Sequence, residues 1–214
     1  MVDLLSRPFQ ARPSAGNVAQ SRSKRAFDAC AAAFGLLLLA PFLLAVAVLI
    51  RLDSPGRVLF SQRRYGRDGK TFRIYKFRTM TATASRDSFA QAVVGDARIT
   101  RLGKILRKTS IDELPQLLNV LKGDMALVGP RPHPLDLDDH FSGLIPDYMR
   151  RYAARPGITG LAQISGHRGP TPTVEAMAER VKYDLAYIDG WSFRSDLNIL
   201  QRTVFHVMDL RHER

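Results

Sequence analysis

The sequence contains little cysteine and has a shortage of acidic residues. Cys30 is the only cysteine among 214 residues, which excludes an intrachain disulfide framework and a zinc site of the CxxC type. A single thiol also fits a reducing compartment. Asp and Glu number 20 against 32 Lys and Arg, giving a formal net charge of +12. This excess predicts a polyanionic partner, which is nucleic acid, an anionic membrane surface or a phosphorylated substrate.

The basic charge is concentrated in one part of the chain. Residues 51–108 contain fifteen of the Lys and Arg residues and only four acids. This region directly follows residues 29–50, which form the most apolar stretch of the sequence and carry no charge. The adjacency of an apolar run and a basic region indicates a membrane surface.

The uncharged run at 29–50 is long enough to enter a membrane. As a helix its 22 residues cover about 33 Å, which is enough to cross a hydrocarbon core. The run is too long for the core of a signal peptide, and no small-residue cleavage site precedes a polar segment. A buried core helix is the soluble alternative, but so uniform a run is rare in a soluble domain of this size. We therefore expect membrane contact.

A proline divides this apolar run. Pro41 must kink the helix because proline lacks a backbone donor and clashes with the preceding turn. Lys24 and Arg25 precede the run, and Arg51 follows it. Basic flanks mark the cytoplasmic side, and here they occur at both ends. The charges favour a hairpin bent at Pro41 only slightly over a kinked span.

Local patterns predict the remaining elements. Asp68-Gly69 is a turn signal that predicts a β-hairpin over 57–80. Residues 98–108 form a basic amphipathic helix, typical of a helix at an anionic membrane surface, although an ordinary surface helix is the alternative. Residues 81–96 lack periodicity and predict a mobile loop. Further helices are predicted after Asp112-Glu113, at 174–188 and at 195–210.

Two adjacent acids are the first candidates for chemistry. Pro115 is tolerated only in the first turn of a helix, so Asp112 and Glu113 lie at or just before a helix N-terminus. The helix dipole stabilises the ionised carboxylates there. One interpretation is helix capping by Asp112 or Ser110.

Basic residues around these acids favour a second interpretation. Carboxylates near Lys76, Arg78, Arg107 and Arg131 would be ionised and able to attack phosphorus while the cations neutralise phosphate charge. A carboxylate pair also suits Mg²⁺, which bridges to substrate phosphates. Arg131 lies between two prolines, a rigid position that suits bidentate phosphate contact.

Other polar segments give weaker signals. Residues 155–160 (RPGITG) predict a rigid turn that either approaches a ligand or is purely structural. The histidines at 133, 140 and 167 show no metal spacing. We expect the acids at 136, 138 and 139 to form a solvated loop.

These motifs occur together in a recognisable order. The matching stretches are KRAFD at 24–28, the apolar run broken at Pro41, LDSPGRVLFSQRRYGRDGKTFRIYKFRTM at 52–80, RITRLGKILRKTSIDELPQLLNVLKGDMALVGPRP at 98–132, RPGITGLAQISG at 155–166 and RVKYDLAYIDGWSFRSDLNIL at 180–200. Through them the chain resembles the bacterial sugar transferases. These are monotopic polyprenyl-phosphate phosphoglycosyl transferases that start exopolysaccharide or O-antigen repeat units.

The resemblance implies a two-step reaction. Asp112 matches the family's nucleophile and would attack the β-phosphate of a UDP-sugar, releasing UMP. Undecaprenyl phosphate would then attack the aspartyl-phosphosugar intermediate. Glu113 matches the partner acid, expected to hold Mg²⁺ together with Asp112.

The resemblance also assigns supporting residues. Lys76, Arg107 and Arg131 match basic positions that bind the substrate phosphates, and Asp184 matches a further substrate-binding residue. Pro41 matches the break of a re-entrant membrane helix. Many members place Ser before that proline, where this chain has Ala40, and the exchange removes a hydroxyl able to satisfy freed backbone groups.

Together these observations predict an α+β, mostly helical, monotopic membrane protein. It would have a Pro-broken re-entrant helix hairpin, a β-hairpin and interfacial amphipathic helices. We expect a flexible basic tail at 1–22, a re-entrant membrane helix at 23–51 and a cytoplasmic catalytic domain at the membrane interface over 52–214. The resemblance implies the cytoplasmic face of the bacterial inner (plasma) membrane.

The predicted partners are a UDP-sugar, undecaprenyl phosphate and membrane lipids, and a homo-oligomer is left open. A nucleic-acid-binding module would leave the apolar run unexplained and lacks a helix-turn-helix, zinc or RNP-type signature, so no nucleic acid is expected. A non-catalytic membrane scaffold would need no acidic pair. Residues 166–185 are most similar to members that transfer glucose 1-phosphate.

Overall fold

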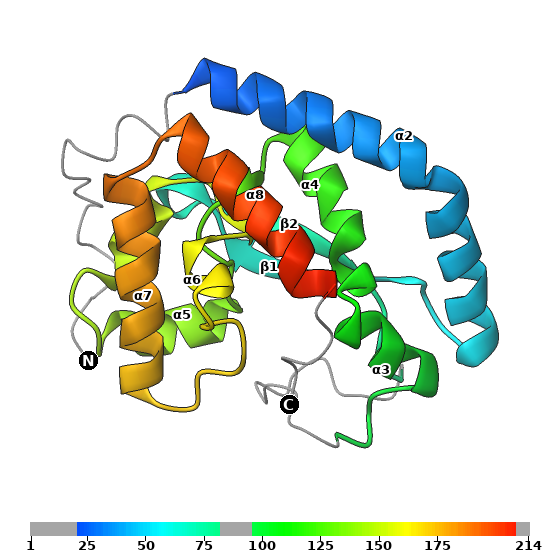
Figure 1. Ribbon diagram of the computed structural model, residues 1–214. Coiled ribbons are helices and arrows are strands. Elements are labelled where there is room, and N and C mark those ends of the chain that lie inside the picture. The colour runs from blue at the N-terminus through cyan, green and yellow to red at the C-terminus, as the bar shows by residue number, and fades with distance from the viewer. Residues whose placement is uncertain (1–20, 82–95, 209–214) are drawn as a thin grey trace.

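Helices make up most of the described part of the chain, which also contains two small sheets (Figure 1). The computed structural model describes residues 21–81 and 96–208. The predicted α+β, mostly helical fold class is confirmed. The tail predicted at 1–22 and the loop predicted at 81–96 lie outside the described residues, apart from their edges.

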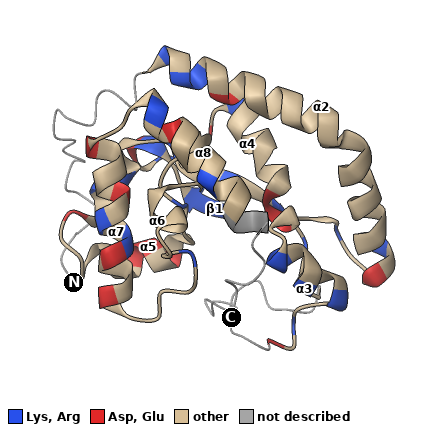
Figure 2. Cartoon of the chain, viewed as in Figure 1, with Lys and Arg blue, Asp and Glu red and all other residues tan. Residues whose placement is uncertain are grey.

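The apolar run forms most of one long helix, α2 (Arg22–Asp53), which has Pro41 inside it. Ser21 caps this helix by accepting a hydrogen bond from the Lys24 backbone N–H at 3.1 Å. The helix bends part-way along its length (Figure 1), as the loss of a backbone donor at Pro41 predicts. Its charged residues lie at the two ends, and its middle carries none (Figure 2).

Both ends of α2 are attached to the rest of the chain. At its start, Lys24 Nζ lies 2.6 Å from Asp196 Oδ2 on α8 (Phe193–Met208). At its end, the Arg78 guanidinium donates to the carbonyls of Ser54 at 2.6 Å and Ile50 at 3.2 Å. The two ends therefore contact the same folded body.

The predicted β-hairpin is confirmed. β1 (Leu59–Tyr65) pairs antiparallel with β2 (Thr71–Phe77). The 3-10 helix η3 (Arg67–Gly69) joins them, and Asp68 (φ 59°) and Gly69 (φ 72°) adopt left-handed conformations there. Asp and Gly accept this conformation more readily than most residues, which explains the turn signal.

A second sheet pairs β3 (Ala126–Val128) in parallel with β4 (Gly157–Thr159). A Cβ at Gly157 would lie 2.1 Å from the Gly129 backbone nitrogen. The RPGITG segment therefore lies close to another backbone segment. This contact supports the interpretation that the turn is structural.

The basic helix is shorter than predicted. α3 (Arg101–Lys108) begins after Thr100, whose side chain accepts from the Gly103 N–H, and Arg98 instead pairs with Asp96. The helix predicted after the acids is a 3-10 segment followed by an α-helix. The remaining elements are η4 (Ile111–Gln116), α4 (Leu117–Lys122), α5 (Leu135–Ser142), η5 (Tyr148–Ala153), α6 (Leu161–Ile164) and α7 (Val174–Asp189).

Large apolar side chains cover the outside of α2. Its most apolar window has a mean hydropathy of 2.8 and is only 11% buried, so length and composition allow the helix to enter a membrane. Ile105 on α3 is also exposed. The exposed apolar side chains of α2 are Phe34, Leu37, Leu38, Phe42, Leu44, Val48, Leu49 and Leu52.

Candidate active site

The two adjacent acids lie in the first turn of η4, and both are buried. Ser110 precedes them in the left-handed conformation (φ 58°), and its side chain makes no capping hydrogen bond. Instead, Arg168 donates a hydrogen bond to the Ser110 hydroxyl. These contacts do not support capping by Ser110, and the local backbone turns both carboxylates into the folded body.

Glu113 is held by two cations. Arg131 donates to both carboxylate oxygens, at 2.5 Å to Oε1 and 3.1 Å to Oε2, and Lys76 donates to Oε1 at 2.8 Å. Burial alone would raise the pKa of Glu113, but the charges of Arg131 and Lys76 hold it well below its usual range. Glu113 is therefore ionised, and it fixes both cations beside Asp112.

Asp112 has a different environment from its neighbour. Burial and then the charge of Glu113 raise its pKa to about 6, against the opposing charges of Lys76, Arg107 and Arg131. Within the described residues, the Asp112 carboxylate accepts no hydrogen bond. The carboxylate is thus ionised at neutral pH, more basic than an ordinary aspartate and free to react.

Arg107 completes the cationic side of the site. It lies in the last turn of α3 and close enough to Asp112 to lower that residue's pKa. Its Nη1 atom is buried and has no hydrogen-bond partner among the described residues. An unpaired guanidinium N–H beside a reactive carboxylate suits a phosphate oxygen.

Arg131 is positioned by a second, buried arginine. Arg151 is 1% exposed and donates from Nη2 to the Arg131 carbonyl at 2.8 Å and to Asp184 Oδ2 at 2.7 Å. The structure therefore places Asp184 behind Arg131, in contact with Arg151, and not beside Asp112. Its predicted contact with substrate stays a prediction.

The prediction that Asp138 lies in a solvated loop is wrong. Asp138 is fully buried on α5, where it accepts a hydrogen bond from the Tyr148 hydroxyl at 2.6 Å and lies 3.5 Å from Arg151 Nη1. Burial and then Arg151 lower the pKa of His133 to about 3, so its neutral ring accepts from Arg151. The pattern of acids could not reveal this because Arg151 lies on a separate element.

Arg78 was expected to lie near Asp112 and Glu113, but its guanidinium contacts the end of α2. β2 ends at Phe77, so Arg78 no longer follows the alternation that would place it beside Lys76. Its guanidinium instead donates to the carbonyls of Ile50, Ser54 and Pro55 at the end of α2.

A largely apolar cavity of about 400 Å³ adjoins Glu113. The polar side chains of Gln163 and Arg168 also line it, and Gln163 Oε1 is buried without a hydrogen-bond partner in the part of the chain described. No local sequence pattern indicates this cavity, because its walls come from segments far apart in the chain. Its apolar lining is Ile111, Leu114, Leu117, Leu127, Ile158, Ile164 and Leu200.

A comparison with known protein families identifies the family of this chain. The family described as "Bacterial sugar transferase" matches residues 19–210. The chain belongs to this family. The resemblance that the motifs predict is therefore confirmed.

Several named bacterial proteins are similar to this chain. The UDP-glucose:undecaprenyl-phosphate glucose-1-phosphate transferase of Caulobacter vibrioides is 54% identical over 187 residues, which are 87% of this chain and 70% of the relative. A protein of the same name from Klebsiella pneumoniae is 49% identical over 85% of this chain, which spans only 39% of it. The exopolysaccharide production protein PSS of Rhizobium leguminosarum is 50% identical, over 85% of this chain and 92% of the relative.

Magnesium is the cofactor that the family resemblance implies. The described residues contain no group of three or more His, Cys, Asp and Glu side chains able to hold a metal. Mg²⁺ however is often bound by one or two carboxylates, with substrate phosphates and water as the other ligands. From the residues that the structure describes, Asp112 accepts no hydrogen bond and Glu113 Oε2 accepts one. The acidic pair therefore fits such a shared site, though not one built from protein alone.

Proposed function

We propose that this chain transfers a sugar 1-phosphate from a UDP-sugar to undecaprenyl phosphate through a covalent intermediate on Asp112. The observation that carries the proposal is a buried, basic carboxylate beside an ion-paired acid and three cations. Undecaprenyl phosphate appears in the names of relatives from Caulobacter, Klebsiella and Aeromonas. Their names support the acceptor and the class of reaction.

In the first step an Asp112 oxygen attacks the β-phosphorus of the UDP-sugar. The new acyl–phosphate bond forms as the bond to the bridging oxygen breaks, and UMP leaves with that electron pair. Arg107 and Arg131 neutralise the charge that develops on the phosphate oxygens. Glu113 holds Lys76 and Arg131 in place during this step.

In the second step a phosphate oxygen of undecaprenyl phosphate attacks the same phosphorus. The acyl–phosphate bond breaks, the lipid diphosphate sugar forms and the Asp112 carboxylate is regenerated. Covalent catalysis lets UMP leave before the bulky lipid acceptor binds, so one phosphate site serves both substrates. Asp112 and Glu113 would hold Mg²⁺, which supplies further neutralisation of phosphate charge when bound.

We also propose that α2 is re-entrant and keeps the acids at the cytoplasmic surface of the inner membrane. A straight helix of 32 residues would be about 48 Å long. Yet both ends contact the same folded body, and the helix bends between them (Figure 1). Its exposed apolar middle would lie in the lipid, while the charged ends stay in water.

The test of the function is release of UMP from a panel of UDP-sugars. The purified chain in detergent is mixed with undecaprenyl phosphate and each sugar nucleotide in turn. UDP-glucose is expected to react fastest, since glucose appears in the names of relatives 54% and 49% identical to this chain. UDP-N-acetylgalactosamine is the comparison substrate, because it appears in the name of a relative that is 44% identical to this chain. No UMP from any sugar nucleotide would refute the proposal.

Activity is expected to rise with pH through the pKa of Asp112. The reaction needs the ionised carboxylate, and its pKa of about 6 leaves only about a tenth of it ionised at pH 5. Between pH 5 and pH 8, kcat/KM for UMP release should therefore increase about tenfold. A flat profile across this range would contradict the assigned role of Asp112.

Removing divalent metal is expected to stop UMP release. The three basic side chains share the site with two carboxylates, so they neutralise the charge of the substrate diphosphate only in part. Treatment with EDTA should therefore abolish activity, and added Mg²⁺ should restore it. Calcium is the matched control, because it prefers more ligands at longer distances than Mg²⁺ does. Full activity in EDTA would remove the metal role from Asp112 and Glu113.

Cysteine labelling tests the topology of α2. In a Cys30→Ala background, single cysteines replace Ser23 and Lys108, which are both exposed. A re-entrant helix predicts that a membrane-impermeant reagent labels both from the cytoplasmic side only. A cysteine at Leu44 should be protected and serves as the control for burial in lipid. Labelling of the first two positions from opposite sides would show a true span.

A further inference from the structure

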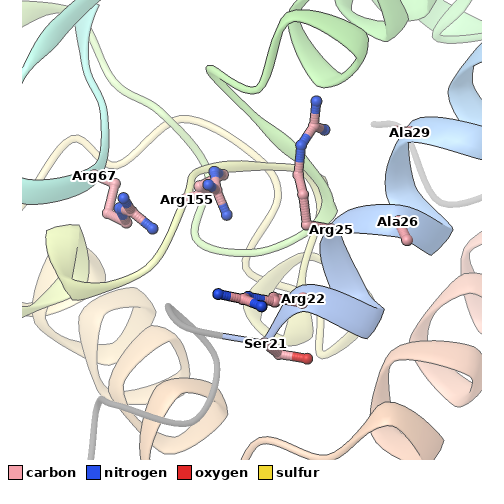
Figure 3. Close-up of a pocket in the computed structure, with 7 residues that line it drawn as sticks. All are labelled: Ser21, Arg22, Arg25, Ala26, Ala29, Arg67 and Arg155. Carbon is pink, nitrogen blue, oxygen red and sulfur yellow. The ribbon is translucent and has the colours of Figure 1, made fainter.

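A second basic site lies at the start of α2. It is a pocket of about 530 Å³ that four arginines line, together with small side chains of α2 (Figure 3). The arginines are Arg22, Arg25, Arg67 and Arg155. None of the five charged residues assigned to phosphate transfer lines this pocket, so it is separate from the candidate active site.

Two of these arginines are fixed by backbone carbonyls. Arg25 donates to the carbonyls of Val120 at 2.6 Å and Leu121 at 2.8 Å, and Arg155 Nε donates to Gly123 O at 3.0 Å. Both therefore pack against the end of α4, whose carbonyls leave the guanidinium charge unneutralised. The pocket has a rigid wall in place before any ligand binds.

The other two arginines come from different elements. Arg22 is in the first turn of α2, and Arg67 is in the turn of the β-hairpin. Figure 3 shows Arg22, Arg67 and Arg155 directed toward a shared space, whereas Arg25 extends toward α4. Three guanidinium groups from three segments thus converge on one volume.

Within residues 21–81 and 96–208, the acids whose charges act on Arg155 are Asp28 and Asp68. Arg67 Nε lies 3.2 Å from Asp68 Oδ2, but both side chains are at least a third exposed, so water screens that pair. Asp28 is paired with Lys24, and the first turn of α2 contains no acid. Burial, followed by the charges of Arg67 and Arg25, lowers the pKa of Arg155, as expected where like charges gather.

We propose that this pocket binds a phosphate group, carried either by a free phosphate compound or by an anionic lipid headgroup. Planar guanidinium groups make paired hydrogen bonds to phosphate oxygens, and three of them surround a tetrahedral anion from several sides. A bound phosphate would also offset the mutual repulsion of the arginines. This inference goes beyond the proposed function, since it needs neither Asp112 nor Glu113.

The experiment compares a double variant, Arg22→Gln with Arg67→Gln, against Arg63→Gln. Arg63 is an exposed arginine of β1 that does not line the pocket, so its loss changes charge but not the site. One arm measures binding of inorganic phosphate to the full chain in neutral detergent by calorimetry. The other measures binding to phosphatidylcholine vesicles with and without phosphatidylglycerol.

The double variant should bind its phosphate ligand at least about tenfold more weakly than the control variant. A loss in the calorimetric arm would indicate a free phosphate compound, and a loss only with phosphatidylglycerol would indicate a lipid headgroup. UMP release in detergent should stay at the level of the control, which separates this inference from the transfer reaction. Equal binding of both variants in both arms would overturn it.

Discussion

The Asp112→Asn variant is expected to release UMP at least about 1000-fold more slowly than the unmodified chain. An amide is not a nucleophile, and no other described carboxylate lies free beside Arg107 and Arg131, since Glu113 is already held by ion pairs. Single-turnover release of UMP from the UDP-sugar, without undecaprenyl phosphate, measures the first step directly. Substantial release by this variant would rule out Asp112 as the nucleophile.

The same variant should be more stable than the unmodified chain at neutral pH. The pKa of Asp112 is raised by folding, so its ionisation opposes folding once the pH exceeds the unfolded value near 3.8. Asparagine removes this cost, about 1–3 kcal/mol above pH 6, and the difference should vanish as the pH falls below 4. Thermal unfolding at pH 7.5 and pH 4 measures it.

Asp136→Asn is the matched control for both measurements. Asp136 is an exposed acid of α5, and the same exchange there should leave UMP release and stability nearly unchanged. An inactive but stabilised Asp112→Asn variant that still sediments with membranes would separate lost chemistry from lost folding.

Sequence reasoning worked best where one local pattern determines one local structure. The Asp68-Gly69 turn signal located the hairpin, since its left-handed backbone is a property of those two residues. Pro115 likewise placed Asp112 and Glu113 in a first helical turn. The positions of Lys76 and Arg131 beside Glu113 followed from the family's motifs and not from spacing alone.

Sequence reasoning failed where a side chain's partner lies far along the chain. The acids at 136, 138 and 139 suggested a solvated segment. The partners of Asp138, however, are Tyr148 and Arg151, which lie 10 and 13 residues later on η5. Arg78 looked like a site cation, but the end of β2 turned it toward α2. The arginine pocket combines residues from 22 to 155, and no local pattern brings these together.

The buried arginine behind Arg131 carries the second large prediction. Arg151→Met is expected to lower the free energy of unfolding by about 3–5 kcal/mol, because it leaves Asp184 and Asp138 buried without their cation. Thermal or urea unfolding in detergent measures the loss. Arg150→Met is the matched control: its partner Asp189 is exposed, and the loss should stay below about 1 kcal/mol.

A second variant keeps this prediction testable if Arg151→Met does not fold. Adding Asp184→Asn removes one of the two stranded charges, so the double variant should recover part of the lost stability. It should still release UMP slowly, because the Arg131 carbonyl lacks the Arg151 donor that fixes it. Recovery of stability without recovery of kcat would show that Arg151 positions the phosphate-binding arginine. Full activity in the stable double variant would show that the buried network serves folding alone.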